Sequence, residues 1–331
     1  MSDDKPEGRK RGKFVRQPSS KSPSTSSPVE VDAGPGSPVT EAPGSPVDEA
    51  LCAGPQLYTI NWPVENCCAH VYILHGYAEH CERYNAFCET LNKHKISVAT
   101  HDHVGHGQSD GHRFHVDRFD TYVTDAIELM KEHRREVGED KPFIMFGHSM
   151  GGLLATHCML QVPQLFTACI LSSPCLKIHG KYNKLPLRVA ARALSWIAPR
   201  FYIPSRALAL DPKDVIADEK DREGYATDPL IWHYQSKPGF TVAVFDAIDE
   251  AQKNLMNLKV KCLVQHGTDD LVCDVAGVEP FKRIPEVAQL KLYEGARHAL
   301  LLDTQEIRNV VIQDCLDFIN SVVFDFETSS S

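Results

Sequence analysis

The sequence predicts an α/β fold with a mainly parallel central sheet flanked by helices. Short apolar and β-branched runs recur after residue 56, among them HVYILHG, ISVATHD, FIMFGHS and CLVQHG, and runs of this length are typical of buried parallel strands. Longer stretches with helical periodicity alternate with them, at residues 122–136, 153–161 and 307–323. Because the crossover between parallel strands is usually a helix, this alternation favours a sheet covered on both faces.

The chain divides into three regions by composition. Residues 1–54 are expected to be a disordered tail, because 22 of the first 50 residues are Ser, Pro or Gly and only one is aromatic. Such a segment has too little apolar surface to offset the entropy of ordering. Residues 55–175 and 252–325 carry the α/β alternation and form the predicted core. The intervening residues 176–251 lack strong β runs and are too long for a simple connection, so we expect an inserted helical cap.

Charge and cysteine usage exclude several classes of protein. The formal net charge is −9, so the chain has no general attraction for nucleic-acid phosphates, and we expect no nucleic-acid partner. The eleven cysteines are scattered without a C-x-x-C pair, which predicts neither a disulfide framework nor a thiolate zinc site. The first residues are polar and charged, so we expect no signal peptide. The sequence has no apolar run of about 18 residues, so we expect no membrane-spanning helix. We expect a cytoplasmic protein, and peripheral contact with membranes stays open.

A serine between two glycines is the first candidate for catalysis. In FIMFGHSMGGLLATH a strand-like run ends near Gly147, and a helix-like run begins near Gly151. A G-x-S-x-G turn at such a junction strains the serine backbone and projects its hydroxyl above the sheet, while the glycines avoid clashes. Ser149 is therefore the predicted nucleophile. The helix that follows points its first N–H groups, including that of Met150, at a developing oxyanion.

The acid and the base that a serine nucleophile needs follow later in the chain. The run VKCLVQHG precedes TDDLVCD, and LKLYEG precedes ARHALLLD, which puts Asp269 or Asp270 and then His298 in loops after two late strands. Ser, Asp, His is the chain order of α/β-hydrolases. A second oxyanion donor is expected in the loop after an early strand, and the N–H of Tyr77 in YILHGYAEH has this place.

These segments together resemble one family. HGYAEHCERY, DHVGHGQSDG, GHSMGG, GTDDLVCD and EGARH are similar, in order and spacing, to the motifs of the monoglyceride lipase and lysophospholipase-like α/β-hydrolases over about residues 57–323. The resemblance implies the α/β-hydrolase fold. It assigns the nucleophile, acid and base to Ser149, Asp270 (rather than Asp269) and His298, the oxyanion donors to Tyr77 and Met150, and the substrate-binding positions to Glu79, His80, Arg83 and Tyr225.

The sequence departs from this family at the expected head-group pocket. Tyr77 and Ala78 replace a usually smaller pair, and Leu301 stands where family members often have a histidine near the glycerol pocket. Cys273 matches a family cysteine near the site. The choice of head group therefore stays open.

Closely spaced histidines also raise the question of a metal site. The cluster comprises His101, His103, His106, His112 and His115. We expect no metal there, because D-x-x-G-H-G-x-S is a loop of the resembling family, in which Asp102 and its neighbours hold a turn. A Ser-His-Asp hydrolase also needs no metal or other cofactor.

One segment of the predicted cap, LPLRVAARALSWIAPRF, has the pattern of an amphipathic helix. Arg188 and Arg192 fall on a different face from its apolar residues. Such a helix lines an acyl tunnel, contacts a bilayer or packs on the core, and these three interpretations stay open.

The predicted activity is hydrolysis of the ester of a monoacylglycerol, or of a related single-chain lipid ester, to a free fatty acid and glycerol. The reaction is expected to pass through an acyl-enzyme on Ser149. A lysophospholipase or broad carboxylesterase of the same fold is the alternative. A hydrolase fold that only binds ligands, without catalysis, is disfavoured by the complete set of catalytic residues.

Overall fold

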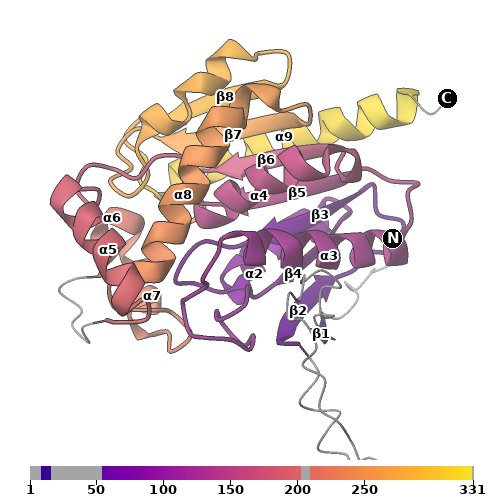
Figure 1. Ribbon diagram of the computed structural model, residues 1–331. Coiled ribbons are helices and arrows are strands. Elements are labelled where there is room, and N and C mark those ends of the chain that lie inside the picture. The colour runs from indigo at the N-terminus through magenta and orange to yellow at the C-terminus, as the bar shows by residue number, and fades with distance from the viewer. Residues whose placement is uncertain (1–8, 16–53, 203–208, 330–331) are drawn as a thin grey trace, which may run out of the picture.

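The central sheet has the architecture predicted from the sequence (Figure 1). The computed structural model describes residues 9–15, 54–202 and 209–329. Its eight-stranded sheet has the order β1-β2-β4-β3-β5-β6-β7-β8. The strands are β1 (Lys10–Val15), β2 (Gln56–Trp62), β3 (Ala69–Leu74), β4 (Ile96–His101), β5 (Phe143–His148), β6 (Ala168–Ser172), β7 (Lys261–Gly267) and β8 (Ala288–Tyr293). In this order, every pair of neighbouring strands from β4 to β8 is parallel. The strand β2 is antiparallel to both β1 and β4. The predicted mainly parallel sheet is therefore confirmed.

Helices cover both faces of the sheet, which explains why its central strands are apolar throughout. Every residue of β3, β4 and β5 is buried. On one face, α3 (Asp120–Val137) and α4 (Met150–Gln161) share a core cluster with the strands. On the other face, α2 (Asn85–Lys93) and α9 (Gln305–Ser329) contribute to a second cluster. Since strands buried on both faces leave little room for polar side chains, the polar chemistry concentrates at the strand ends.

The N-terminal region departs from the expectation of a disordered tail over residues 1–54. Lys10–Val15 form β1, which pairs with β2 and becomes the edge of the sheet, and Phe14 packs partly buried against the core. Just before the strand, Arg9 lies 2.6 Å from Glu82. The prediction was wrong for this strand because the open edge of β2 offers backbone hydrogen bonds that composition alone does not reveal. The rest of the predicted tail lies outside the described residues.

Among the described residues, four α-helices lie between β6 and β7, in the region where the sequence predicts a cap over residues 176–251. They are α5 (Leu185–Ile197), α6 (Pro212–Val215), α7 (Glu219–Thr227) and α8 (Pro238–Asn254). Figure 1 shows α5, α6 and α7 gathered on the left, beside the sheet. In contrast, α8 packs against α4, and Ala247 and Ala251 on α8 join the core cluster. This helix therefore runs across the predicted boundary between cap and core.

Candidate active site

The turn between β5 and α4 holds Ser149 in a strained backbone conformation. Its φ and ψ are 53° and −116°, values that residues with side chains rarely adopt. The flanking glycines are required by close contacts. A Cβ on Gly147 would lie 2.4 Å from the carbonyl oxygen of Gly151, and one on Gly151 would lie 2.0 Å from that of Leu74. The G-x-S-x-G segment thus makes the tight strand-to-helix turn that the sequence predicts.

Two loops bring an imidazole and a carboxylate to the serine hydroxyl. His298, in the loop after β8, has its Nε2 2.8 Å from Ser149 Oγ, and its Nδ1 lies 2.7 Å from Asp270 Oδ2. Asp270, in the loop after β7, is buried. Its Oδ1 accepts two backbone N–H groups of the following turn, each at 2.8 Å. The preceding Asp269 is exposed, so Asp270 is the aspartate that reaches the imidazole.

The surroundings of Asp270 keep its carboxylate ionised. Burial raises the pKa of this group, but the charge and hydrogen bond of His298, with help from His266, outweigh burial and hold the pKa below its ordinary value of 3.8. A charged Asp270 keeps the proton of His298 on Nδ1. The Nε2 of His298 is then free to accept the proton of Ser149.

Two buried histidines lie near Asp270 and His298 and were not predicted from the sequence. His266 Nε2–H donates to the carbonyl of Cys273 at 3.0 Å and lies 3.4 Å from Asp270 Oδ2. The ring of His148 lies 4.9 Å from that of His298, centroid to centroid. Burial and the neighbouring His298 lower the pKa of His148 to about 4, so a neutral ring lies beside the base. Their position at the carboxyl ends of β5 and β7 is the signal that could have found them.

The two backbone N–H groups expected to bind an oxyanion are both available. Tyr77 and Met150 line the same cavity as Ser149. Met150 begins α4, and the first N–H groups of a helix have no partner within it. Among the residues that the structure describes, neither N–H donates to another protein group. Both are therefore free to bind an oxygen that becomes negative at the serine.

A cavity of about 430 Å³ opens onto Ser149 and His298. Most of its wall is apolar, and most of its lining residues come from the segment between β6 and β7. These apolar side chains include Leu187, Ala191, Phe240, Val244 and Phe245. A concave, mainly apolar wall with a few polar groups suits a ligand with an apolar chain and a small polar part.

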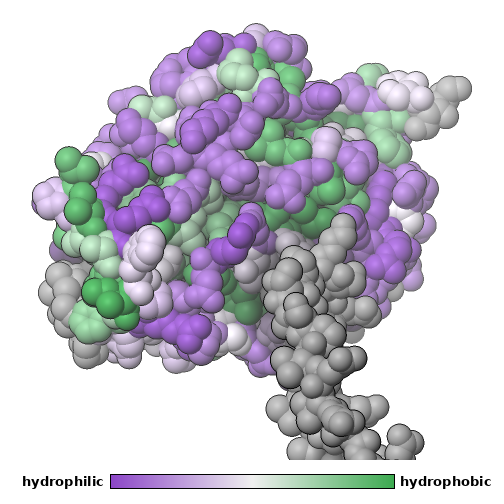
Figure 2. All heavy atoms as spheres, in the orientation of Figure 1, coloured by the Kyte–Doolittle hydropathy of each residue, from purple (hydrophilic) through white to green (hydrophobic). Residues whose placement is uncertain are grey.

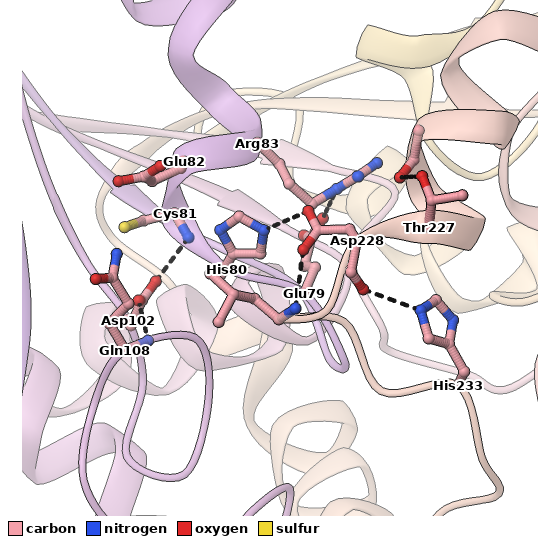
Figure 3. Close-up of polar contacts among 12 residues, drawn as sticks. Glu79, His80, Cys81, Glu82, Arg83, Asp102, Gln108, Thr227, Asp228 and His233 are labelled. Atoms are coloured by element: carbon pink, nitrogen blue, oxygen red, sulfur yellow. Dashed lines mark hydrogen bonds and ion pairs between the residues drawn. The ribbon is translucent and has the colours of Figure 1, made fainter.

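Three of the four predicted substrate-binding residues line the cavity, and the fourth does not. Glu79, Arg83 and Tyr225 line the cavity. The Arg83 guanidinium lies 5.1 Å from the centre of the Tyr225 ring, and its Nε donates to Glu79 Oε2 at 3.2 Å. His80 is absent from the described cavity wall. Its Nε2 lies 2.9 Å from Asp228 Oδ2, as Figure 3 shows.

Asp102, in the loop after β4, holds both this loop and the segment that begins at Cys81. Asp102 Oδ1 accepts the N–H of Cys81 at 2.8 Å, and Oδ2 accepts the N–H of Gln108 at 2.7 Å (Figure 3). Gly107 has a φ of 47°, and a Cβ there would lie 2.0 Å from Asp102 Oδ2. The prediction that Asp102 holds a turn is confirmed.

Within the described ranges, one group of side chains has metal-like spacing: Asp270, Cys273 and His298, whose ligand atoms lie within 4.8 Å of one another. Asp270 and His298 already bond each other. Hydrogen bonding to Cys175 and burial raise the pKa of the Cys273 thiol well above its ordinary value of 9.0. The hydrogen bonds that join Asp270, His298 and Ser149 account for this grouping.

Comparisons with known proteins identify the family of the chain. Residues 65–305 match the family described as serine aminopeptidase, S33. The chain is 31% identical over 260 residues to a monoglyceride lipase homolog of monkeypox virus, which covers 78% of this chain and 92% of that protein. It is 30% identical over 267 residues to the monoglyceride lipase of Homo sapiens, at 79% and 86% coverage.

A solved structure extends the similarity to three dimensions. A soluble variant of the Saccharomyces cerevisiae monoglyceride lipase, in complex with a substrate analog, matches with a TM-score of 0.73 and 25% identity, over 81% of this chain and 92% of that one. The resemblance to monoglyceride lipases is thereby confirmed. The chain belongs to the serine aminopeptidase S33 family of α/β-hydrolases, and within it is similar to the monoglyceride lipases.

Proposed function

We propose that this protein hydrolyses the ester of monoacylglycerol with Ser149 as its nucleophile. The observation that carries the proposal is the row of hydrogen bonds from Asp270 through His298 to Ser149, with spacings of 2.7 and 2.8 Å. This row lies at the mouth of a mainly apolar cavity. Relatives named monoglyceride lipases, matched over most of their length, support the choice of substrate.

The chemistry follows from the hydrogen bonds. Ser149 Oγ attacks the ester carbonyl carbon while His298 Nε2 takes its proton, and the charge of Asp270 stabilises the imidazolium. The carbonyl oxygen becomes an oxyanion that accepts the N–H groups of Tyr77 and Met150. When this intermediate collapses, glycerol leaves with the proton from His298, and the acyl group stays on Ser149. Water, deprotonated by His298, then attacks the acyl carbon and releases the fatty acid.

The lining of the cavity supports a way to bind the substrate. Its apolar side chains accommodate the acyl chain, since each buried CH₂ contributes about 0.8 kcal/mol. Glu79 and Arg83, which line the same cavity as Ser149, accommodate the hydroxyl groups of glycerol. Glu79 is the one carboxylate among the described residues that line the cavity.

The hydrogen bonds of Glu79 disfavour an aminopeptidase, which the family description also names. Glu79 Oε1 accepts Gly76 N–H at 2.6 Å and the Tyr84 hydroxyl at 2.8 Å, while Arg83 donates to Oε2. Recognition of the ammonium group of a peptide substrate favours a carboxylate with free lone pairs. Because three of the four acceptor positions of Glu79 are already occupied, the one that remains suits a single hydroxyl donor of glycerol better than an ammonium group with three donors.

The outer surface of α5 supports uptake of substrate from a lipid surface. Figure 2 shows hydrophobic side chains along the left edge of the molecule, where Figure 1 places α5. The exposed large apolar side chains of α5 are those of Leu185, Leu187, Val189, Trp196 and Ile197. Arg192 forms an ion pair with Asp246 of α8 at 2.7 Å. The apolar residues of α5 stay exposed to solvent, as peripheral docking on a bilayer requires. No helix among the described residues has the length and apolar character to cross a membrane.

The test compares the wild type with Ser149→Ala on a monoacylglycerol, a lysophosphatidylcholine and a short p-nitrophenyl ester. We expect the wild type to turn over monoacylglycerol fastest and the folded variant to lose about 10⁴- to 10⁶-fold in kcat. Faster turnover of the lysophospholipid would overturn the choice of substrate. A wild type that neither hydrolyses esters nor reacts with a fluorophosphonate probe would overturn the catalytic role of Ser149.

A further inference from the structure

A row of buried side chains lies beside the loop that carries Tyr77. His75, His101 and His103 are all buried. The rings of His75 and His103 are 3.9 Å apart, centroid to centroid. Nε2 of His101 lies 3.0 Å from Nδ1 of His103, and the hydroxyl of Tyr72 lies 3.1 Å from Nδ1 of His101. The reaction described above uses none of these side chains.

Backbone groups decide which nitrogen of each ring carries the proton. The N–H of His103 donates to His75 Nε2 at 3.0 Å, so this nitrogen is an acceptor. The proton of a neutral His75 therefore lies on Nδ1, which donates to the carbonyl oxygen of Gly76 at 2.8 Å. The carbonyl of His75 can only accept, so His103 Nε2 donates to it at 3.0 Å. His103 Nδ1 then accepts from His101, and His101 Nδ1 accepts from Tyr72.

Burial keeps the three rings neutral, as this assignment requires. Burial lowers the pKa of His101 to about 3. Burial and the neighbouring rings lower the pKa of His75 and of His103 well below 6.5. A proton added to Nε2 of His75 would face the backbone N–H of His103, donor against donor, so His75 keeps its proton on Nδ1 near neutral pH.

The planar peptide between Gly76 and Tyr77 passes this constraint to the oxyanion site. No peptide bond of the described chain is cis, so the Gly76 C=O and the Tyr77 N–H point in opposite directions. A carbonyl held by His75 therefore fixes the direction of the Tyr77 N–H. On its other side, Gly76 N–H donates to Glu79 Oε1 at 2.6 Å. The glycine lies against the nucleophile, because a Cβ there would be 3.3 Å from Ser149 Cβ.

We propose that His75 is a positioning residue, whose Nδ1–H clamps the Gly76 carbonyl and thereby aims the Tyr77 N–H at the oxyanion formed on Ser149. His103 selects the tautomer of His75 that makes this clamp. A donor that is already in place when negative charge develops needs no reorganisation, and such fixed donors contribute strongly to catalysis. The inference rests on the proposed ester hydrolysis at Ser149.

Two substitutions separate the clamp from packing. His75→Gln keeps a polar group near Nε2 for His103 but loses the donor to Gly76, whereas His75→Asn keeps a donor near the place of Nδ1. On a short p-nitrophenyl ester, we expect kcat of His75→Gln to fall about 10- to 100-fold, somewhat less than removal of an oxyanion donor costs. KM should change little, because the clamp acts on the transition state. His75→Asn should retain most of the activity, and affinity for a trifluoromethyl ketone should follow kcat.

His157→Asn is the matched control. It removes another buried imidazole that donates to a backbone carbonyl, from Nε2 to Ala247 at 3.0 Å, away from the Tyr77 loop. We expect it to lower Tm without lowering kcat. In addition, ¹⁵N NMR of the wild type should show the proton of His75 on Nδ1, a measurement that needs no variant to fold.

Three results would overturn the inference: wild-type kcat and ketone affinity in His75→Gln, an equal loss of kcat in His75→Asn, or an NMR spectrum with the proton on Nε2. A wild type without any esterase activity would overturn the proposed function instead, while the NMR result would still decide the tautomer.

Discussion

Replacing Asp270 by Asn tests the role of this buried carboxylate in the hydrogen bonds that join Asp270, His298 and Ser149. Asp270 Oδ1 accepts two backbone N–H groups at 2.8 Å, and Oδ2 accepts His298 Nδ1–H at 2.7 Å. The amide oxygen of the substituted side chain can keep the two backbone bonds, so the loop should keep its shape. The NH₂ group of the amide then faces His298 Nδ1, and because NH₂ only donates, the imidazole must carry its proton on Nε2. In that tautomer His298 cannot accept the proton of Ser149.

The expected loss in kcat is about 10⁴-fold, the size of effect seen when a triad imidazole is held in the wrong tautomer. At 1.36 kcal/mol for each tenfold change, this corresponds to about 5.4 kcal/mol of transition-state stabilisation. The assay is steady-state hydrolysis of a short p-nitrophenyl ester, with circular dichroism to verify folding. Asp269→Asn is the matched control, because it makes the same change one residue earlier on an exposed side chain. Equal kinetics of the two variants, or the reverse order, would refute the assignment of the acid.

Three further predictions concern stability and lipid contact. Deleting residues 1–15 should lower Tm and promote self-association relative to deleting residues 1–8, because it uncovers the edge of β2; identical melting and size-exclusion profiles would refute a structural role for β1. Trp196→Ser combined with Ile197→Ser should weaken co-sedimentation with lipid vesicles and spare hydrolysis of a short ester, since burying one large apolar side chain contributes roughly 1.5 to 3 kcal/mol; unchanged sedimentation would exclude α5 as the docking surface. The lowered pKa of Asp270 contributes stability that is fully present above about pH 4 and is lost as the pH falls through the folded-state value. The urea midpoint of the wild type should therefore drop more steeply in acid than that of Asp270→Asn, and parallel curves would contradict this.

Local sterics explain why part of the site could be predicted from the sequence. Gly147 and Gly151 flank Ser149 because a side chain at either position would collide with the backbone, and such a constraint leaves its mark within a few residues. The order of strands and helices was also predictable, since strands buried on both faces are apolar throughout. His298 could be named because it follows a strand that the pattern identifies.

Contacts between distant segments were beyond the sequence. Asp269 and Asp270 are adjacent, and residue pattern alone left both open; the folded loop buries one and exposes the other. The tautomer of His75 depends on the backbone N–H of His103, a contact between the loops after β3 and β4. β1 forms because a polar stretch finds the free edge of β2.

The helix α5 shows the same division within one element. Its periodicity alone determined that Arg188 and Arg192 share a face apart from the apolar residues, because side chains three to four positions apart lie together on a helix. Only the tertiary structure decided where each face points. The Arg188 guanidinium lies 4.3 Å from the centre of the Phe245 ring on α8, Leu187 and Ala191 line the cavity, and Trp196 is left exposed. The physical reason is that the period of the helix determines which side chains lie next to one another on it. Whether a side chain is buried depends on which other segments of the chain pack against that face.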